Sequence, residues 1–173
     1  TFSFDVALIN GSTDGVGHAR MFHQYDGGHM TFEYEFNNSS ITKINLGTYP
    51  GGWHYLSVQE DQIAGGFDTE FHNITAILVA GGNSKIYYDY VLVAEGTLPS
   101  PQSLSAFSGF NFNSSSGEFR MKSANIWYGS AVSDVDIIQH TTNLANIIPP
   151  TNSWDFTNPD ETTLFDLVGD HHG

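Results

Sequence analysis

The chain has 173 residues, which is enough for one domain with a sizeable core, whereas two domains would each be small. Nineteen acidic residues against five Lys and Arg give a formal net charge of −14, which argues against binding to nucleic acid or to anionic membranes, because phosphate is bound by clustered cations. The absence of cysteine excludes disulfides and thiolate sites, and the aromatic content of 14% with eighteen Gly favours β structure over helix.

Short segments of alternating apolar and polar residues predict strands throughout the first half of the chain. Residues 2–8 form the first segment, and Asn10-Gly11 ends it as a turn. Residues 30–36 give the clearest alternation, with aromatic and acidic side chains on opposite faces. Further strands are predicted at residues 19–25, 41–46 and 53–58.

The second half continues in the same way. Residues 74–79 are a continuous apolar run of strand length, which predicts a strand buried on both faces. Residues 85–98 predict another strand segment, in which Ile86, Tyr88, Tyr90 and Leu92 fall on one face.

The segment from residue 118 to residue 139 predicts a strand followed by a short helix. The apolar phase shifts by one residue between Met121 and Ala124, which predicts a β-bulge. Ser133 is the expected N-cap of a helix near residues 133–140, with Val135 and Ile138 as its apolar side. The predicted fold class is therefore all-β, an antiparallel two-sheet β-sandwich with one short helix.

Two motifs resemble those of a known family. Tyr87-Tyr88-Asp89-Tyr90 is similar to an aromatic–x–Asp–Gly hairpin, with Tyr90 where Gly is usual, and residues 130–137 are similar to an aliphatic–small–Ser-Asp-x-x-Ile motif. Together they resemble the laminin G-like and concanavalin A-like lectin–glucanase jelly-roll domains. The resemblance implies a sandwich with a core Trp, here Trp53, and a non-catalytic extracellular module for adhesion or carbohydrate binding, on a cell or virion surface.

The last part of the chain predicts a linker and a further strand. We expect a sandwich domain at residues 1–142, an extended linker at 143–153 that contains Pro149-Pro150, and a terminal strand segment at 154–173. Trp154-Asp155-Phe156 resembles the opening strand of family domains. The segment can complete its own sandwich, or it can be donated to a neighbouring copy in a structural assembly built by strand exchange; the stiff Pro149-Pro150 favours donation.

Glu33 and Glu35 are the strongest candidates for catalysis, because residues two apart on a strand share a face and retaining glycosidases place two carboxylates about 5 Å apart. The glycosidase motif of this fold has three alternating acids, and Thr31 and Asn37 occupy the outer positions here. We therefore expect an outward polar face and no enzyme, with a divergent glycoside hydrolase as an alternative.

Metal sites are weakly indicated. The eight His show no spacing typical of zinc enzymes. Many relatives in the family that the chain resembles hold calcium at the sandwich edge, where Asp89 and Asp26 are the candidate ligands, although Lys122 replaces an acidic residue usual there. Calcium is thus a candidate cofactor and no other cofactor is expected.

Sugar recognition needs an exposed aromatic side chain beside polar acceptors. Tyr25, Asp26 and His29 on one loop, and Tyr49 beside Trp53 on another, are the candidate carbohydrate-binding residues, although Trp53 itself is expected in the core.

Glycosylation sequons begin at four turns or strand ends. Asn10, Asn38, Asn73 and Asn113 each start an Asn-x-Ser/Thr motif, which is consistent with an extracellular location. The expected partners are a glycan or surface protein and, through residues 151–173, further copies of the chain.

Overall fold

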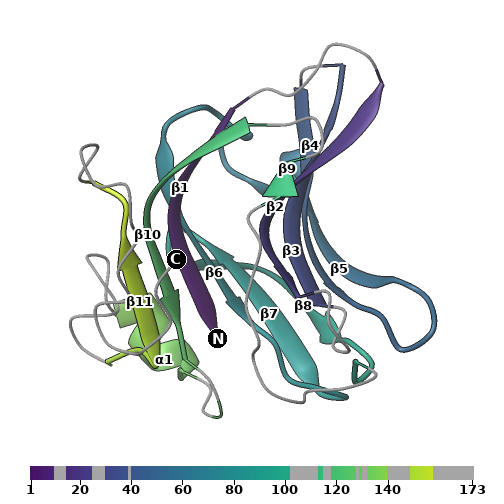
Figure 1. Cartoon of the computed structure of the whole chain (residues 1–173), viewed down its shortest axis with the longest axis vertical. Helices are drawn as coiled ribbons and strands as arrows, with labels where there is room; N and C mark the ends of the chain where they lie inside the picture. Colours follow the sequence, from purple (N-terminus) through teal and green to yellow (C-terminus); the bar gives the residue numbers. More distant parts are fainter. Residues whose placement is uncertain are drawn as a thin grey trace.

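The structure is a computed structural model in which two antiparallel sheets face each other (Figure 1). It describes residues 1–9, 15–24, 30–38, 40–101, 113–114, 118–127, 129, 132–139 and 149–157. The predicted all-β sandwich is confirmed. Among the described helices, none is long and apolar enough to cross a membrane.

The six-stranded sheet has the strand order β11-β10-β1-β6-β7-β8, and all of its pairings are antiparallel. Its strands are β1 (Phe2–Ile9), β6 (Phe71–Ile77), β7 (Asn83–Tyr88), β8 (Val91–Thr97), β10 (Glu118–Ile126) and β11 (Asn152–Asp155).

The five-stranded sheet has the order β5-β4-β3-β2-β9 and is also antiparallel throughout. Its strands are β2 (Val16–Gln24), β3 (Met30–Asn37), β4 (Ser40–Thr48), β5 (His54–Gln59) and the two-residue β9 (Asn113–Ser114). A single turn of 3-10 helix, η1 (Glu60–Gln62), follows β5.

The main core lies between the sheets, where the inward residues of each strand interdigitate. Phe4 of β1 packs against Phe32 of β3 with ring centroids 5.9 Å apart, and both side chains are fully buried. The predicted core residues Phe4, Phe32, Tyr34, Ile77, Tyr88 and Ile126 are all buried, but the prediction for Trp53 is wrong, since that side chain is 37% exposed.

A second, smaller cluster lies on the outer face of the six-stranded sheet. It contains Ile77, Tyr87, Trp127, Val132 and Ile137, and the helix α1 (Asp134–Gln139) contributes the last of these. In Figure 1, α1 lies against the lower end of β10 and β11. This sheet therefore has apolar residues buried on both of its faces, as the run at residues 74–79 predicts.

The helix α1 begins where the sequence predicts, but the side that it buries differs from the predicted one. Asp136 donates its backbone N–H to Ser133 Oγ over 3.2 Å, so Ser133 is the N-cap. Ile137 is fully buried and Val135 is exposed, so the predicted Val135–Ile138 side is wrong for Val135; the side chain of Ile138 lies outside the described residues.

The β7–β8 hairpin turns tightly at Asp89 and Tyr90, whose φ angles are 46° and 66°. Two positive φ angles in a two-residue hairpin loop are the reason why Gly or Asn is common there, and Tyr90 adopts this backbone conformation without being Gly. The alternation of buried and exposed side chains stops at this turn. Ile86 and Tyr88 face the main core, whereas Leu92 is 39% exposed, so the single predicted face does not extend beyond Tyr88.

The bulge predicted near Met121 is present in β10. Asp5 pairs with Ser123 and Val6 pairs with Met121, which leaves Lys122 as the extra residue.

The last described residues add an edge strand to the six-stranded sheet of the same chain. Asn152 to Asp155 pair with Ile126 to Ser123 of β10, and Trp154 is buried in the main core. The strand begins inside the expected linker, and in the single chain it forms in cis rather than in a neighbour. Donation to a second copy stays a prediction, and residues 158–173 lie outside the described part.

Candidate functional site: the outer face of the five-stranded sheet

The pairing of β2, β3, β4 and β5 places polar residues in rows across the outer face of the five-stranded sheet. Residues that pair directly across antiparallel strands share a face, so each row crosses all four strands. The three rows, from β2 to β5, are His23-Thr31-Gly47-Tyr55, Arg20-Glu33-Asn45-Ser57 and His18-Glu35-Lys43-Gln59.

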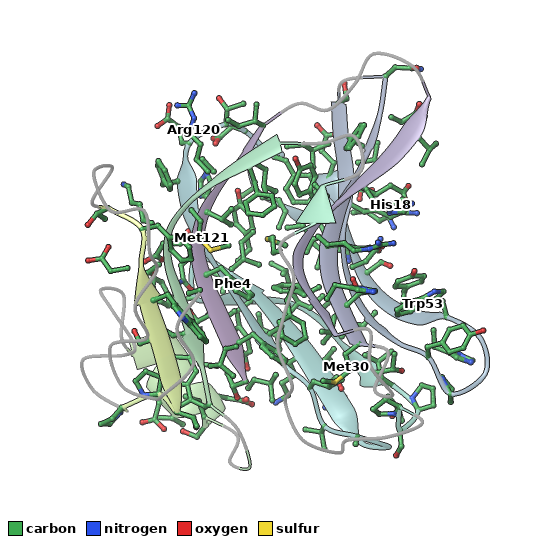
Figure 2. The ribbon with its side chains drawn as sticks, viewed as in Figure 1. Phe4, His18, Met30, Trp53, Arg120 and Met121 are labelled. Carbon is green, nitrogen blue, oxygen red and sulfur yellow. The ribbon has the colours of Figure 1, made fainter. Side chains whose placement is uncertain are left out.

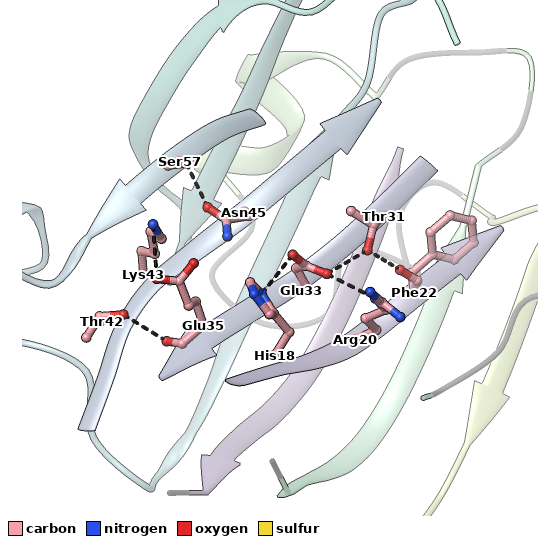
Figure 3. A network of polar contacts seen from close by, with 10 residues as sticks. All are labelled: His18, Arg20, Phe22, Thr31, Glu33, Glu35, Thr42, Lys43, Asn45 and Ser57. Carbon is pink, nitrogen blue, oxygen red and sulfur yellow. Dashed lines mark hydrogen bonds and ion pairs between the residues drawn. The ribbon is translucent and has the colours of Figure 1, made fainter. Parts of the chain in front are cut away.

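Glu33 is at the centre of a polar network in these rows (Figure 3). Its carboxylate accepts a hydrogen bond from Arg20 Nε over 3.1 Å and one from Thr31 Oγ1 over 3.2 Å, and its other oxygen lies 3.1 Å from His18 Nδ1. The residue is only 1% exposed, although it belongs to the outer face. A buried carboxylate must be paired and hydrogen-bonded, and Arg20 and His18 satisfy that requirement.

Glu35 repeats the arrangement one row further along. Lys43 Nζ lies 3.0 Å from Glu35 Oε1, and the two side chains are 31% and 16% exposed. In the same row as Arg20 and Glu33, Ser57 Oγ donates a hydrogen bond of 2.7 Å to Asn45 Oδ1. The expected outward polar face is thus present, but its carboxylates are held by neighbouring cations.

The ring of Tyr55 lies over Gly47, because a Cβ built at that glycine would be 2.7 Å from the ring. A residue with a side chain at position 47 would therefore lift the ring from the sheet. Burial, and then the negative charge of Glu33, raise the pKa of the Tyr55 phenol to about 12. The hydroxyl therefore stays protonated at neutral pH, which makes it a hydrogen-bond donor and acceptor.

Trp53 continues the aromatic surface beyond the rows. Its ring stacks on Tyr55 with centroids 5.7 Å apart and an interplanar angle of 10°, and it contacts Tyr49 edge-on at 5.4 Å. The buried ring of His23 lies 6.1 Å away. In Figure 2, His18 and Trp53 project from the side of this sheet that faces away from the six-stranded sheet.

Trp53 and Tyr55 are 37% and 43% exposed. Exposed aromatic rings, with the two ion pairs beside them, combine an apolar surface with many hydrogen-bonding groups. We refer to Tyr49, Trp53 and Tyr55 together with Arg20, Glu33, Glu35 and Lys43 as the polar-aromatic face.

The sequence predicted this face only in part. Tyr49 belongs to it, while Tyr25, Asp26 and His29 lie outside the described residues. Arg20 and Tyr55 were missed, although the period-two alternation of β2 and β5 contains the signal that places them on the same side as Glu33.

Asp89, a candidate calcium ligand, has hydrogen-bond partners within the chain, and its role in binding calcium stays a prediction. One of its carboxylate oxygens accepts the backbone N–H of Asn73, and the other lies 2.6 Å from His72 Nδ1. Burial opposes the charge on His72, but hydrogen bonds and charges of Asp89 and Asp68 outweigh it, so the pKa of His72 is raised. Among the described residues, no three His or acidic side chains are grouped to hold a metal ion.

The sequons differ in accessibility. Asn38 is exposed at the β3–β4 turn, where a glycan has room. Asn73 is buried, and its amide donates to Ser3 Oγ and Asp5 Oδ1, so a glycan on that nitrogen would remove at least one of these hydrogen bonds in the folded chain. Its glycosylation stays a prediction. Asn10 and the side chain of Asn113 lie outside the described residues.

Neither models of known protein families nor curated protein sequences give a match to this chain. The fold and the site define a class: an antiparallel β-sandwich with a polar-aromatic face on the outside of one sheet.

Proposed function

We propose that the chain is a non-catalytic, extracellular carbohydrate-binding module of the concanavalin A-like sandwich class, and that the polar-aromatic face binds the sugar. The observation that carries the proposal is the pair of exposed, parallel rings of Trp53 and Tyr55 beside Glu33 and Arg20. Aromatic rings pack against the C–H surface of a sugar, and neighbouring polar groups bind its hydroxyls.

The proposal is tested by affinity electrophoresis and calorimetry against a panel of polysaccharides. Trp53→Ala and Tyr55→Ala are expected to weaken binding by at least about tenfold each, because each removes apolar contact area from the face. Val91→Ala is the matched control, since Val91 is a 62%-exposed apolar residue on β8 of the other sheet. Loss of binding in the control alone, or no binding by the unmodified chain, contradicts the proposal.

A divergent glycoside hydrolase is the second candidate, because Glu33 and Glu35 share the face with the exposed rings. Against it stand the missing third acid at Thr31 and the cations that already hold both carboxylates. Reducing-sugar release by the unmodified chain that is lost in Glu33→Gln with Glu35→Gln would establish hydrolysis and overturn the non-catalytic proposal.

A further inference from the structure

We propose that the ligand of the polar-aromatic face is an uncharged polysaccharide and that Glu33 sets this preference by neutralising Arg20. The proposal rests on the proposed function and extends it to the charge of the ligand. It is carried by the position of each cation and each carboxylate on and around the face.

Every lysine or arginine on the face has a carboxylate partner. Glu33 holds Arg20 through Nε at 3.1 Å, and Glu35 holds Lys43 at 3.0 Å. Because Glu33 is almost completely buried, solvent screens its interaction with Arg20 less than that of an exposed pair. The two pairs leave the face with no net charge from these four residues.

The other three of the five Lys and Arg residues lie elsewhere. Lys85 pairs with Asp134 beside the second cluster, Lys122 lies 3.9 Å above the ring of Phe71, and Arg120 is on the opposite side of the molecule from Trp53 in Figure 2. None of them can offer a charge to a ligand on the polar-aromatic face. A carboxylate or sulfate group on a sugar would therefore meet no uncompensated lysine or arginine, in a chain of net charge −14 that repels polyanions.

The same residues suit hydroxyl groups. The guanidinium of Arg20 uses Nε for Glu33 and keeps its terminal N–H donors on a side chain that is 33% exposed. The Tyr55 hydroxyl can donate or accept, as any tyrosine hydroxyl does at neutral pH. Sugar hydroxyls also both donate and accept, so an uncharged sugar can satisfy these groups without bringing a buried charge.

The first test compares neutral polysaccharides (β-glucan, xylan, mannan) with polyuronates (alginate, polygalacturonate) at equal ionic strength. The expected result is binding to at least one neutral polymer at least about tenfold tighter than to either polyuronate. Binding to polyuronates alone would overturn the charge inference and leave the proposed function standing. Binding to no polysaccharide would overturn both.

The second test is Glu33→Gln, which keeps the side-chain shape and releases the charge of Arg20. The ratio of neutral to polyuronate affinity is expected to fall by about tenfold or more, since a carboxylate ligand can then pair with Arg20. A purely structural role for Glu33 would weaken both ligands alike, and an unchanged ratio in the folded variant would overturn the inference.

Two further variants serve as a replacement and as a control for this test. Glu35→Gln releases Lys43 in the same way at a less buried pair, so it replaces Glu33→Gln if that variant does not fold. Asp134→Asn makes the same change of net charge by releasing Lys85 on the other sheet, and it is expected to leave the ratio unchanged. A shift in the ratio of the same size with Asp134→Asn would show that overall charge decides the preference, which also overturns the inference.

Discussion

Each of the two sheets has a Trp and a Tyr on its outer side, and the two pairs differ in how much of their surface is exposed. On the six-stranded sheet, Trp127 and Tyr87 are covered by Ile137 of α1 and become a second core. On the five-stranded sheet, Trp53 and Tyr55 keep 37% and 43% of their surface exposed. Trp127 is 3% exposed. An aromatic residue on the outer side of a sheet is therefore structural or available to a ligand according to what the rest of the chain packs on it.

The largest expected effect is the difference between Trp127→Ala and Trp53→Ala in the free energy of unfolding. Removing the buried Trp127 leaves a cavity under α1 and should lower the free energy of unfolding by about 3–5 kcal/mol. Removing the exposed Trp53 should cost about 1 kcal/mol or less. Urea denaturation measures both, and equal losses would mean that Trp53 is also structural.

A smaller loss is expected from Ser133→Ala, which removes the N-cap of α1. The free energy of unfolding should fall by about 1 kcal/mol, because the backbone N–H of Asp136 loses its acceptor. Urea denaturation checks the value, and Ser133→Asp, which can still cap, serves as the control. A loss in Ser133→Asp as large as in Ser133→Ala would show that the cap is not the cause.

A pH-dependent effect is expected at His72, which lies between Asp89 and Asp68 at 2.6 and 2.8 Å. The pKa of His72 is raised, so its contribution to stability is complete below its ordinary value of 6.5 and disappears as pH rises through the raised value. A hydrogen bond from His72, with one from the backbone of Glu70, lowers the pKa of Asp68, whose contribution is present above 3.8 and is lost as pH falls through the lowered value.

The difference in Tm between the unmodified chain and His72→Gln should therefore be largest between about pH 4 and pH 6.5 and should shrink on both sides. Thermal unfolding across this range checks the profile. The lost stacking of His72 on Tyr88, at 4.7 Å, adds a difference that does not vary with pH. A constant difference at every pH would show that the ion pairs contribute nothing.

The smallest effect on stability, but a clear one on binding, is expected for Gly47→Ala. The new Cβ would lie 2.7 Å from the ring of Tyr55 and 2.9 Å from Cγ2 of the buried Thr31. The exposed ring moves away from the sheet, so the affinity for polysaccharide falls by about tenfold, while the contact with Thr31 costs a small amount of stability. Gly52→Ala is the control in the neighbouring loop, because its Cβ would meet no atom within 4 Å. Unchanged affinity in Gly47→Ala would remove Tyr55 from the binding face.

The sequence alone determined the class of fold and most of the main core. Alternation at period two places Phe32 and Tyr34 inside, the phase shift near Met121 gives the bulge at Lys122, and Ser133 starts the helix. These features depend on a few neighbouring residues and on the geometry of a single strand or helical turn, so they can be derived locally.

Only the tertiary structure decided which outer face is covered. Trp53 directly precedes β5 and Trp127 directly follows β10, but α1 packs over Trp127, while Trp53 has Tyr49 and Tyr55 as neighbours and remains partly exposed. The burial of Glu33 likewise required Arg20 and His18 from another strand, thirteen and fifteen residues earlier in the chain. The register between strands and the packing of distant segments bring these groups together, and neither is contained in the alternation of any single strand.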